Sequence, residues 1–189
     1  MKRVCVFKLG TLLGHLEYYY KWEEGNMVQR FNFRPINALQ DRQTIVQFRK
    51  DSYIVSFGTP DELGDEEVYV AWMAMAQAMA PEGFVMMECE GQPVGQIELE
   101  VILYDGHPIG YVDLLYLIPE YRDRGIGKLQ LDYAEAYFKN KGLLEYHLRV
   151  SPTNKRALRF YEKHGLKKIM TEHLTQTVTR MGKKFTSAI

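Results

Sequence analysis

One short loop near the middle of the chain brings together residue types that could hold a phosphate group. Arg122, Arg124 and Lys128 supply positive charge, and Gly125 and Gly127 leave the main chain uncovered. A helix that begins at these glycines would direct free N–H groups and the positive end of its dipole at a bound anion. The spacing therefore predicts a phosphate-binding loop, with an ordinary strand-to-helix turn as the alternative interpretation.

The residues on either side of this loop predict the elements that position it. Residues 111–118 are apolar and favour a strand, interrupted only by Asp113, as in a strand that is covered on both faces. Pro119 cannot donate to a strand ladder and ends that strand. Residues 125–141 then carry apolar side chains at helical spacing, and Gly142 is suited to end the helix.

A second motif follows a strand that is predicted at residues 144–150. Thr153 or Asn154 can cap the next helix, and Gly165 can end it. This helix would carry Tyr161, whose phenol can donate a proton or a hydrogen bond. A strand, a crossover helix and a second strand in this order predict two parallel strands with a right-handed connection.

Together the two motifs resemble those of the GNAT family of N-acetyltransferases. The family carries Q/R-x-x-G-x-G/A after its fourth strand, and the matching residues here are Arg122, Gly125 and Gly127. It also carries N-x-x-A-x-x-F/L-Y-x-x-x-G-F, and the matching residues here are Asn154, Ala157, Phe160, Tyr161 and Gly165, followed by Leu166 in place of Phe. The resemblance is specific over residues 84–170, weak over 31–83 and absent before them.

The resemblance implies an α/β fold with a mixed, mostly antiparallel central sheet flanked by helices. In the GNAT fold the fourth and fifth strands, here 111–118 and 144–150, are parallel and splay apart. The pantetheine arm of acetyl-CoA lies in that gap, where its amides can take up unpaired backbone groups. Residues 27–189 would form this acetyltransferase domain. Residues 1–26 would be an N-terminal extension of uncertain status, with Met27 as a hypothetical natural start.

The same resemblance implies acetyl-CoA as cosubstrate and suggests which residues bind it. The expected cosubstrate-binding residues are Leu117, Ile118, Arg122, Arg124, Gly125, Ile126, Gly127, Lys128, Asn154 and Tyr161. At or near Leu117, a backbone N–H would stabilise the negative charge that develops on the thioester oxygen. An ordinary helix cap explains Asn154 equally well.

Tyr161 falls on the general acid of the family, which would donate to the leaving thiolate. A phenol near pKa 10 and a thiol near 8.5 differ by about 1.5 pH units, so complete transfer is uphill by roughly 2 kcal/mol. That cost is small compared with an enzymatic barrier. The alternative interpretation is an aromatic side chain that only packs beside Phe160.

Asp113 is the residue expected to act on the acceptor amine, because aminoglycoside N-acetyltransferases have an acidic residue at a comparable place. Strand alternation predicts that Asp113 shares a face with Leu115 and Leu117. An ordinary aspartate near pKa 3.9 is too weak a base for an ammonium near 10.4. Either burial raises the pKa of Asp113, or Asp113 orients the ammonium and relays its proton through water, and we favour orientation. The alternative candidates on neighbouring strands are Glu98, Glu100 and His147.

The first half of the chain predicts the elements around the acceptor. Asn37 can cap a helix that runs through about residue 50, whereas residues 52–57 favour a strand. Residues 65–80 predict a second helix, whose apolar end would be buried in the core or would line the acceptor pocket. Residues 84–103 predict a hairpin.

Composition narrows the classes of partner. The chain has 24 Lys and Arg against 24 Asp and Glu, and this balance gives no support for a nucleic acid or an anionic membrane as partner. No apolar stretch is long enough to span a membrane. Cys5 and Cys89 do not make a disulfide framework and fit a reducing cytoplasm. We expect a cytoplasmic protein without a metal, and a homodimer is the oligomer to test because family members often dimerise.

The expected function is transfer of the acetyl group from acetyl-CoA to a primary amine of a small molecule, by direct attack in a ternary complex. Two other hypotheses fit the same motifs. One is a regulator that binds CoA without catalysis, and the other is an acetyltransferase for a protein lysine or N-terminus. The part of the chain that forms the pocket has the weakest resemblance, so the sequence does not choose between the acceptors.

Overall fold

The computed structural model describes residues 4–12, 15–22 and 28–185. Within these ranges nine strands form one sheet in the order β1-β2-β3-β4-β5-β6-β7-β9-β8. The strands are β1 (Val4–Leu12), β2 (His15–Trp22), β3 (Val28–Pro35), β4 (Phe84–Cys89), β5 (Gln92–Tyr104), β6 (His107–Leu117), β7 (Glu145–Val150), β8 (Lys167–His173) and β9 (Thr177–Lys184). The α-helices are α1 (Arg42–Phe57), α2 (Glu66–Met79), α3 (Gly127–Asn140) and α4 (Lys155–Lys163).

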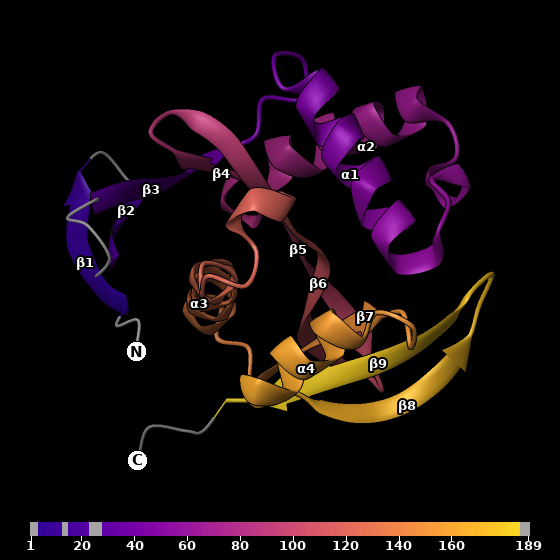
Figure 1. Ribbon diagram of the computed structural model, residues 1–189. Helices are drawn as coiled ribbons and strands as arrows, with labels where there is room; N and C mark the ends of the chain where they lie inside the picture. The colour runs from indigo at the N-terminus through magenta and orange to yellow at the C-terminus, as the bar shows by residue number, and fades with distance from the viewer. Residues whose placement is uncertain (1–3, 13–14, 23–27, 186–189) are drawn as a thin grey trace.

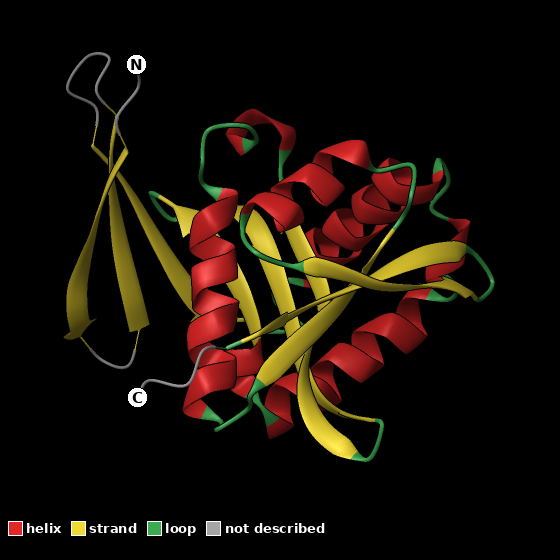
Figure 2. Cartoon of the chain, turned by 90° about the horizontal axis from the view of Figure 1, so that it is seen from below, coloured by secondary structure: helices red, strands yellow, loops and turns green. Residues whose placement is uncertain are grey.

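Three N-terminal strands extend the sheet at one edge. β1 pairs with β2, and β2 pairs with β3 through a register that includes Glu17↔Asn32. Figures 1 and 2 show these strands projecting from the part of the molecule that the helices cover. Two strands therefore come from the segment 1–26. The hypothesis of a start at Met27 concerns a residue outside the described ranges.

Helices cover both faces of the central strands (Figure 2), and each face has its own hydrophobic core. α1 and α2 pack on one face, where Ile45 and Met73 are fully buried beside Tyr116 of β6. α3 packs on the other face, where its apolar stripe buries Leu129 and Phe138 against the sheet. Two covered faces explain why β6 is almost wholly apolar.

The helix α1 differs from the sequence-based expectation at both ends. It begins at Arg42, because Asn37 accepts hydrogen bonds from the N–H groups of Leu39 and Gln40 in a turn before the helix. It continues through residues 52–57, which were expected to be extended. Gly58 ends the helix: it has φ 83° and its N–H donates to the carbonyl of Ile54. Because this glycine cap comes after Phe57, residues 52–57 are helical despite their preference for a strand.

The boundaries of helix α2 match the prediction, and of the two interpretations of its apolar end the pocket wall finds no support. Asp65 caps it by accepting from the N–H groups of Glu67 and Val68. Its apolar end is only partly buried, since Met73 is 0% exposed whereas Met79 is 84% exposed. None of its described side chains lines the cavity described below.

The parallel strands β6 and β7 pair over a short distance and then diverge. Their pairing is limited to Gly110↔Tyr146, Tyr111↔His147 and Val112↔Leu148. β6 continues to Leu117 and β7 to Val150 without further pairing to each other. The predicted splay is therefore confirmed.

A β-bulge interrupts β6 immediately after this point. Glu98 of β5 pairs with Leu114, whereas the next residue, Leu99, pairs with Val112. Asp113 is the extra residue of β6, and its insertion bends the strand.

The bulge changes the face on which Asp113 lies. Leu115 and Leu117 pack with the core under α3, as alternation predicts. Asp113 instead reaches Arg49 of α1, on the face where Leu114 is buried. The prediction that Asp113 shares a face with Leu115 and Leu117 is therefore wrong, because a bulge shifts side-chain alternation by one residue.

Candidate active site

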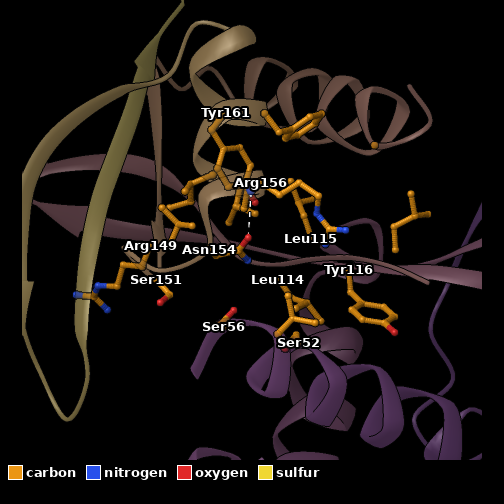
Figure 3. Close-up of a pocket in the computed structure, with 18 of the residues that line it drawn as sticks. Ser52, Ser56, Leu114, Leu115, Tyr116, Arg149, Ser151, Asn154, Arg156 and Tyr161 are labelled. Carbon is orange, nitrogen blue, oxygen red and sulfur yellow. Dashed lines mark hydrogen bonds between the residues drawn. The ribbon is translucent and has the colours of Figure 1, made fainter. Parts of the chain in front are cut away.

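A cavity of about 730 Å³ lies where β6 and β7 diverge. Its walls come from both strands, from α4, from the second half of α1 and from the turn between β8 and β9. Figure 3 shows Ser52 and Ser56 of α1 across the pocket from Ser151, Asn154 and Tyr161. The sequence-predicted residues that line the cavity are Asp113, Leu117, Arg122, Gly125, Gly127, Lys128, Asn154 and Tyr161.

Three residues predicted to bind the cosubstrate do not line this cavity: Ile118, Arg124 and Ile126. The N–H of Ile118 donates to the carbonyl of Val94 at 2.9 Å, on the β5 side. The side chain of Ile126 is fully buried in the core beneath α3, and Arg124 is exposed on the surface. Ile126 could therefore contribute only its backbone.

The backbone of β6 directs N–H groups into the gap at alternate residues. Because Ile118 donates toward β5, the N–H groups of Leu117 and Leu115 point the other way, toward the gap. Arg122 lies on this side of the strand end, since its Nε donates to the carbonyl of Leu117 at 2.6 Å. The N–H of Leu115 is a second candidate donor to the thioester oxygen, beside that of Leu117. The sequence did not indicate that Leu115 also directs its N–H into the gap.

The loop before α3 has the conformation that an anion site requires. Gly125 has φ 82°, a left-handed conformation that favours glycine. Among the described residues, no group accepts from the N–H of Gly125, Ile126 or Gly127, whereas Lys128 already donates to the carbonyl of Gly125. A Cβ at Gly127 would lie 3.4 Å from the ring of Phe160, an ordinary contact. The three N–H groups therefore form a site for a negatively charged oxygen.

Two guanidinium groups face the same end of the cavity. Burial lowers the pKa of Arg122, and the neighbouring charge of Arg156 lowers it further. An anion between two such cations would relieve this repulsion, so the residues fit a diphosphate. Arg156 was missed from sequence, because nothing local shows which face of α4 it occupies. Lys128 is exposed and forms an ion pair with Asp132 one turn along α3.

Two residues of the second motif were expected in the site: Asn154 is the N-cap of α4, and Tyr161 lies within that helix. Asn154 caps the helix, since its Oδ1 accepts from the N–H of Ala157 at 3.1 Å, which leaves its amide nitrogen for other partners. The ring of Tyr161 lies edge-on to Phe160, with centroids 5.4 Å apart. Burial raises the pKa of Tyr161 to about 12. Tyr161 is therefore a protonated donor at any ordinary pH.

Asp113 belongs to a network of buried polar side chains. Arg49 donates to Asp113 Oδ2 at 3.1 Å and to Glu98 Oε2 at 3.0 Å. Glu98 is fully buried and accepts further hydrogen bonds from Tyr69 at 2.6 Å and Gln96 at 2.7 Å. Of the two carboxylates, Asp113 lines the cavity and Glu98 lies behind it.

The buried carboxyl of Glu98 predicts a pH-dependent stability. Burial raises its pKa from 4.5 to about 7. A carboxyl whose pKa is higher in the folded protein stabilises the fold fully below about pH 4.5 and loses that contribution as the pH rises through 7. We expect Glu98 to lower the free energy of unfolding by roughly 2–3 kcal/mol between pH 5 and 8. Urea unfolding of the wild type and Glu98→Gln at both pH values measures this, and equal pH dependence in the two proteins would contradict it.

The other two alternative candidates, Glu100 and His147, do not line the cavity. His147 is 3% exposed, and its ring packs edge-on to Tyr104 with centroids 4.8 Å apart. Burial lowers the pKa of His147 and raises that of Glu100. Neither side chain is placed to contact an acceptor in this cavity.

Comparison with known proteins identifies the family. The model of the acetyltransferase (GNAT) family matches residues 43–166, which is more than half of the chain. The chain belongs to the GNAT family. It is an N-acetyltransferase with acetyl-CoA as cosubstrate, as the two motifs predict. A spermidine N(1)-acetyltransferase of Thermoplasma acidophilum is 40% identical over 143 residues, which cover 69% of this chain and 84% of that protein.

Solved structures confirm the predicted GNAT fold. The PaiA N-acetyltransferase from Thermoplasma acidophilum, in complex with coenzyme A, superposes with a TM-score of 0.68 at 25% identity. The match covers 82% of this chain and 99% of that one. A ribosomal-protein-alanine N-acetyltransferase from Brucella melitensis has a TM-score of 0.63 at 17% identity, covering 81% and 99%, and this likeness concerns the fold alone.

The described residues of this GNAT protein include neither a metal-binding cluster nor a helix that could span a membrane. No three His, Cys, Asp or Glu side chains there gather closely enough to hold a metal ion. None of the described helices combines the length and the hydropathy that crossing a bilayer requires.

Proposed function

We propose that this GNAT enzyme transfers the acetyl group of acetyl-CoA to a primary amine of a small molecule, by direct attack in a ternary complex. The observation that carries the proposal is one cavity whose lining includes the phosphate loop at Gly125, Tyr161 and Asp113. These groups supply an anion site, an acid and a carboxylate, which are the parts that acetyl transfer requires.

The main chain is proposed to hold the cosubstrate, which supplies an activated acetyl group. The N–H groups of residues 125–127 bind the diphosphate, with Arg122 and Arg156 beside them. The N–H groups of Leu115 and Leu117 are the candidate donors to the thioester oxygen as negative charge develops there. Loss of one such donor typically raises a barrier by about 3 kcal/mol.

Tyr161 is proposed to donate a hydrogen bond to the leaving thiolate. With its pKa near 12, complete proton transfer to a thiol of about 8.5 is uphill by about 5 kcal/mol. The donation is therefore partial, or it is completed late in the reaction. Because burial raises its pKa, Tyr161 is better suited to donate a hydrogen bond than to transfer its proton completely.

Asp113 is proposed to orient the acceptor ammonium. Glu98 lies on the far side of the Arg49 guanidinium, and its pKa of about 7 suits a group that takes up a proton near neutral pH. The proton lost by the amine can therefore pass from Asp113 through water to solvent or be shared with Glu98.

A small acceptor is favoured by the contact that joins the two sides of the cavity. The hydroxyl of Thr153, just before α4, donates to the carbonyl of Ser56 in α1 at 3.3 Å. This bridge narrows the space through which a polypeptide would have to reach the gap. The relative named as a spermidine N(1)-acetyltransferase supports the same choice.

A protein N-terminus is the second candidate acceptor. The ribosomal-protein-alanine N-acetyltransferase shares the fold, and the turn between β8 and β9 lines the cavity beside α1, where a peptide could enter. A regulator that binds CoA without catalysis is the third hypothesis. Only the two hypotheses in which the protein is an enzyme require Tyr161 and a route by which the amine loses its proton.

A thiol-release assay with acetyl-CoA distinguishes the three hypotheses. We expect turnover with at least one member of a panel of amino acids, polyamines and aminoglycosides, and much weaker turnover with short peptides. Turnover with peptides alone would support the protein acceptor. Binding of acetyl-CoA without turnover on any amine would support the regulator and would refute the proposal.

A further inference from the structure

Two arginines, one on β7 and one on β9, share one carboxylate of β8 next to the part of the cavity that β7 and the turn between β8 and β9 line. Arg149 of β7 and Arg180 of β9 lie opposite each other in the strand register. The Nε of Arg149 donates to Glu172 at 2.5 Å, and the Nε of Arg180 donates to the same carboxylate at 2.8 Å. This cluster of Arg149, Arg180 and Glu172, here named the arginine pair, has one positive charge in excess.

The arginine pair has capacity for a further anionic partner. Arg180 is 4% exposed, and its buried Nη1 has no hydrogen-bond partner among the described residues. Arg180 does not line the cavity, and its guanidinium lies 4.7 Å from the centre of the Tyr104 ring. A further anion would therefore contact Arg149 and would gain from Arg180 only the attraction of its charge. Arg149 lines the cavity, and Figure 3 shows its side chain extending from β7 toward β8 and β9.

At a pH above about 7, where Glu98 is ionised, the opposite excess of charge lies near Asp113. There one guanidinium, that of Arg49, serves two carboxylates, those of Asp113 and Glu98. Tyr111 also lines the cavity, and the charges of both Arg149 and Asp113 act on its hydroxyl. Burial raises its pKa, Arg149 lowers it and Asp113 raises it. The guanidinium of Arg149 also lies 5.7 Å from the centre of the Tyr111 ring.

We propose that the acceptor carries a carboxylate beside its amine, as an amino acid does. This inference rests on the proposed function and assigns its substrate class. The carboxylate binds at Arg149, and the ammonium lies toward Asp113. A polyamine would instead place a second cation near the positive charge of the arginine pair, which disfavours its binding.

Matched pairs of acceptors test this assignment, because lysine differs from cadaverine, and ornithine from putrescine, only by the carboxylate. We expect kcat/KM to be at least tenfold higher for each amino acid than for its decarboxylated partner. Preference for the diamines, or for spermidine, would overturn the inference while leaving the proposed function intact. If no amine released thiol from acetyl-CoA, both the proposed function and this inference would fail.

Variants of Arg149 give the second arm of the test. Arg149→Gln should raise KM for the amino acid at least tenfold and change KM for the diamine less than threefold, while Glu172 keeps its bond to Arg180. Arg149→Lys should retain most of the preference because the charge remains. Arg42→Gln, at a surface ion pair with Glu67, is the matched control. An equal loss on both acceptors in Arg149→Gln would show a structural role only and would contradict the assignment.

Discussion

Tyr161→Phe is expected to lower kcat about 100-fold, the lower end of the usual contribution of an acid catalyst. The substitution removes one oxygen and keeps the ring that packs on Phe160, so the affinity for acetyl-CoA should change less than twofold. Steady-state kinetics of thiol release and calorimetric titration with acetyl-CoA measure the two quantities.

The pH profile and a control variant sharpen this prediction. Because the pKa of Tyr161 is about 12, its protonation should not produce an alkaline fall in rate below about pH 10. Tyr137→Phe, on α3 and outside the cavity, should leave kcat unchanged. Equal turnover of wild type and Tyr161→Phe would remove this phenol from the mechanism.

Gly127→Val is expected to weaken acetyl-CoA binding at least tenfold, or about 1.4 kcal/mol. A single Cβ at this position would touch Phe160 at 3.4 Å without a clash, so the fold should accept it. The two further methyl groups of valine would occupy the space in front of the N–H groups that bind the diphosphate. Gly127→Ala should show a smaller loss of affinity in the same calorimetric titration.

The stability of the variants must be checked, because valine also lowers helix propensity relative to most residues. Ala136→Val, a half-buried position farther along α3, is the matched control and should bind acetyl-CoA normally. If Gly127→Val bound acetyl-CoA as tightly as the wild type, the assignment of the phosphate loop would be wrong.

The sequence predicted the parts of the site that depend on local signals. Pro119 ends β6, Gly125 takes a left-handed conformation, and Gly165 follows α4, so these residue types alone were enough to place the strand, the loop and the two helices. The splayed strands followed from the family resemblance, and their limited pairing confirms it.

The features that the sequence did not predict arise only when distant segments of the chain pack together. The bulge at Asp113 arises from the register with β5, and neither strand alone shows it. Arg49 is 64 residues from Asp113 in sequence, so nothing near either residue indicates their ion pair. Residues 52–57 have a β-favouring composition, yet the glycine cap at Gly58 and the packing of α1 place them in a helix.

The most direct test of the account is a crystal structure with acetyl-CoA or CoA bound. We predict density for the diphosphate against the N–H groups of residues 125–127, with the arm between β6 and β7 and its acyl end beside Leu115 and Tyr161. Density at another site, or none at millimolar ligand, would contradict the account.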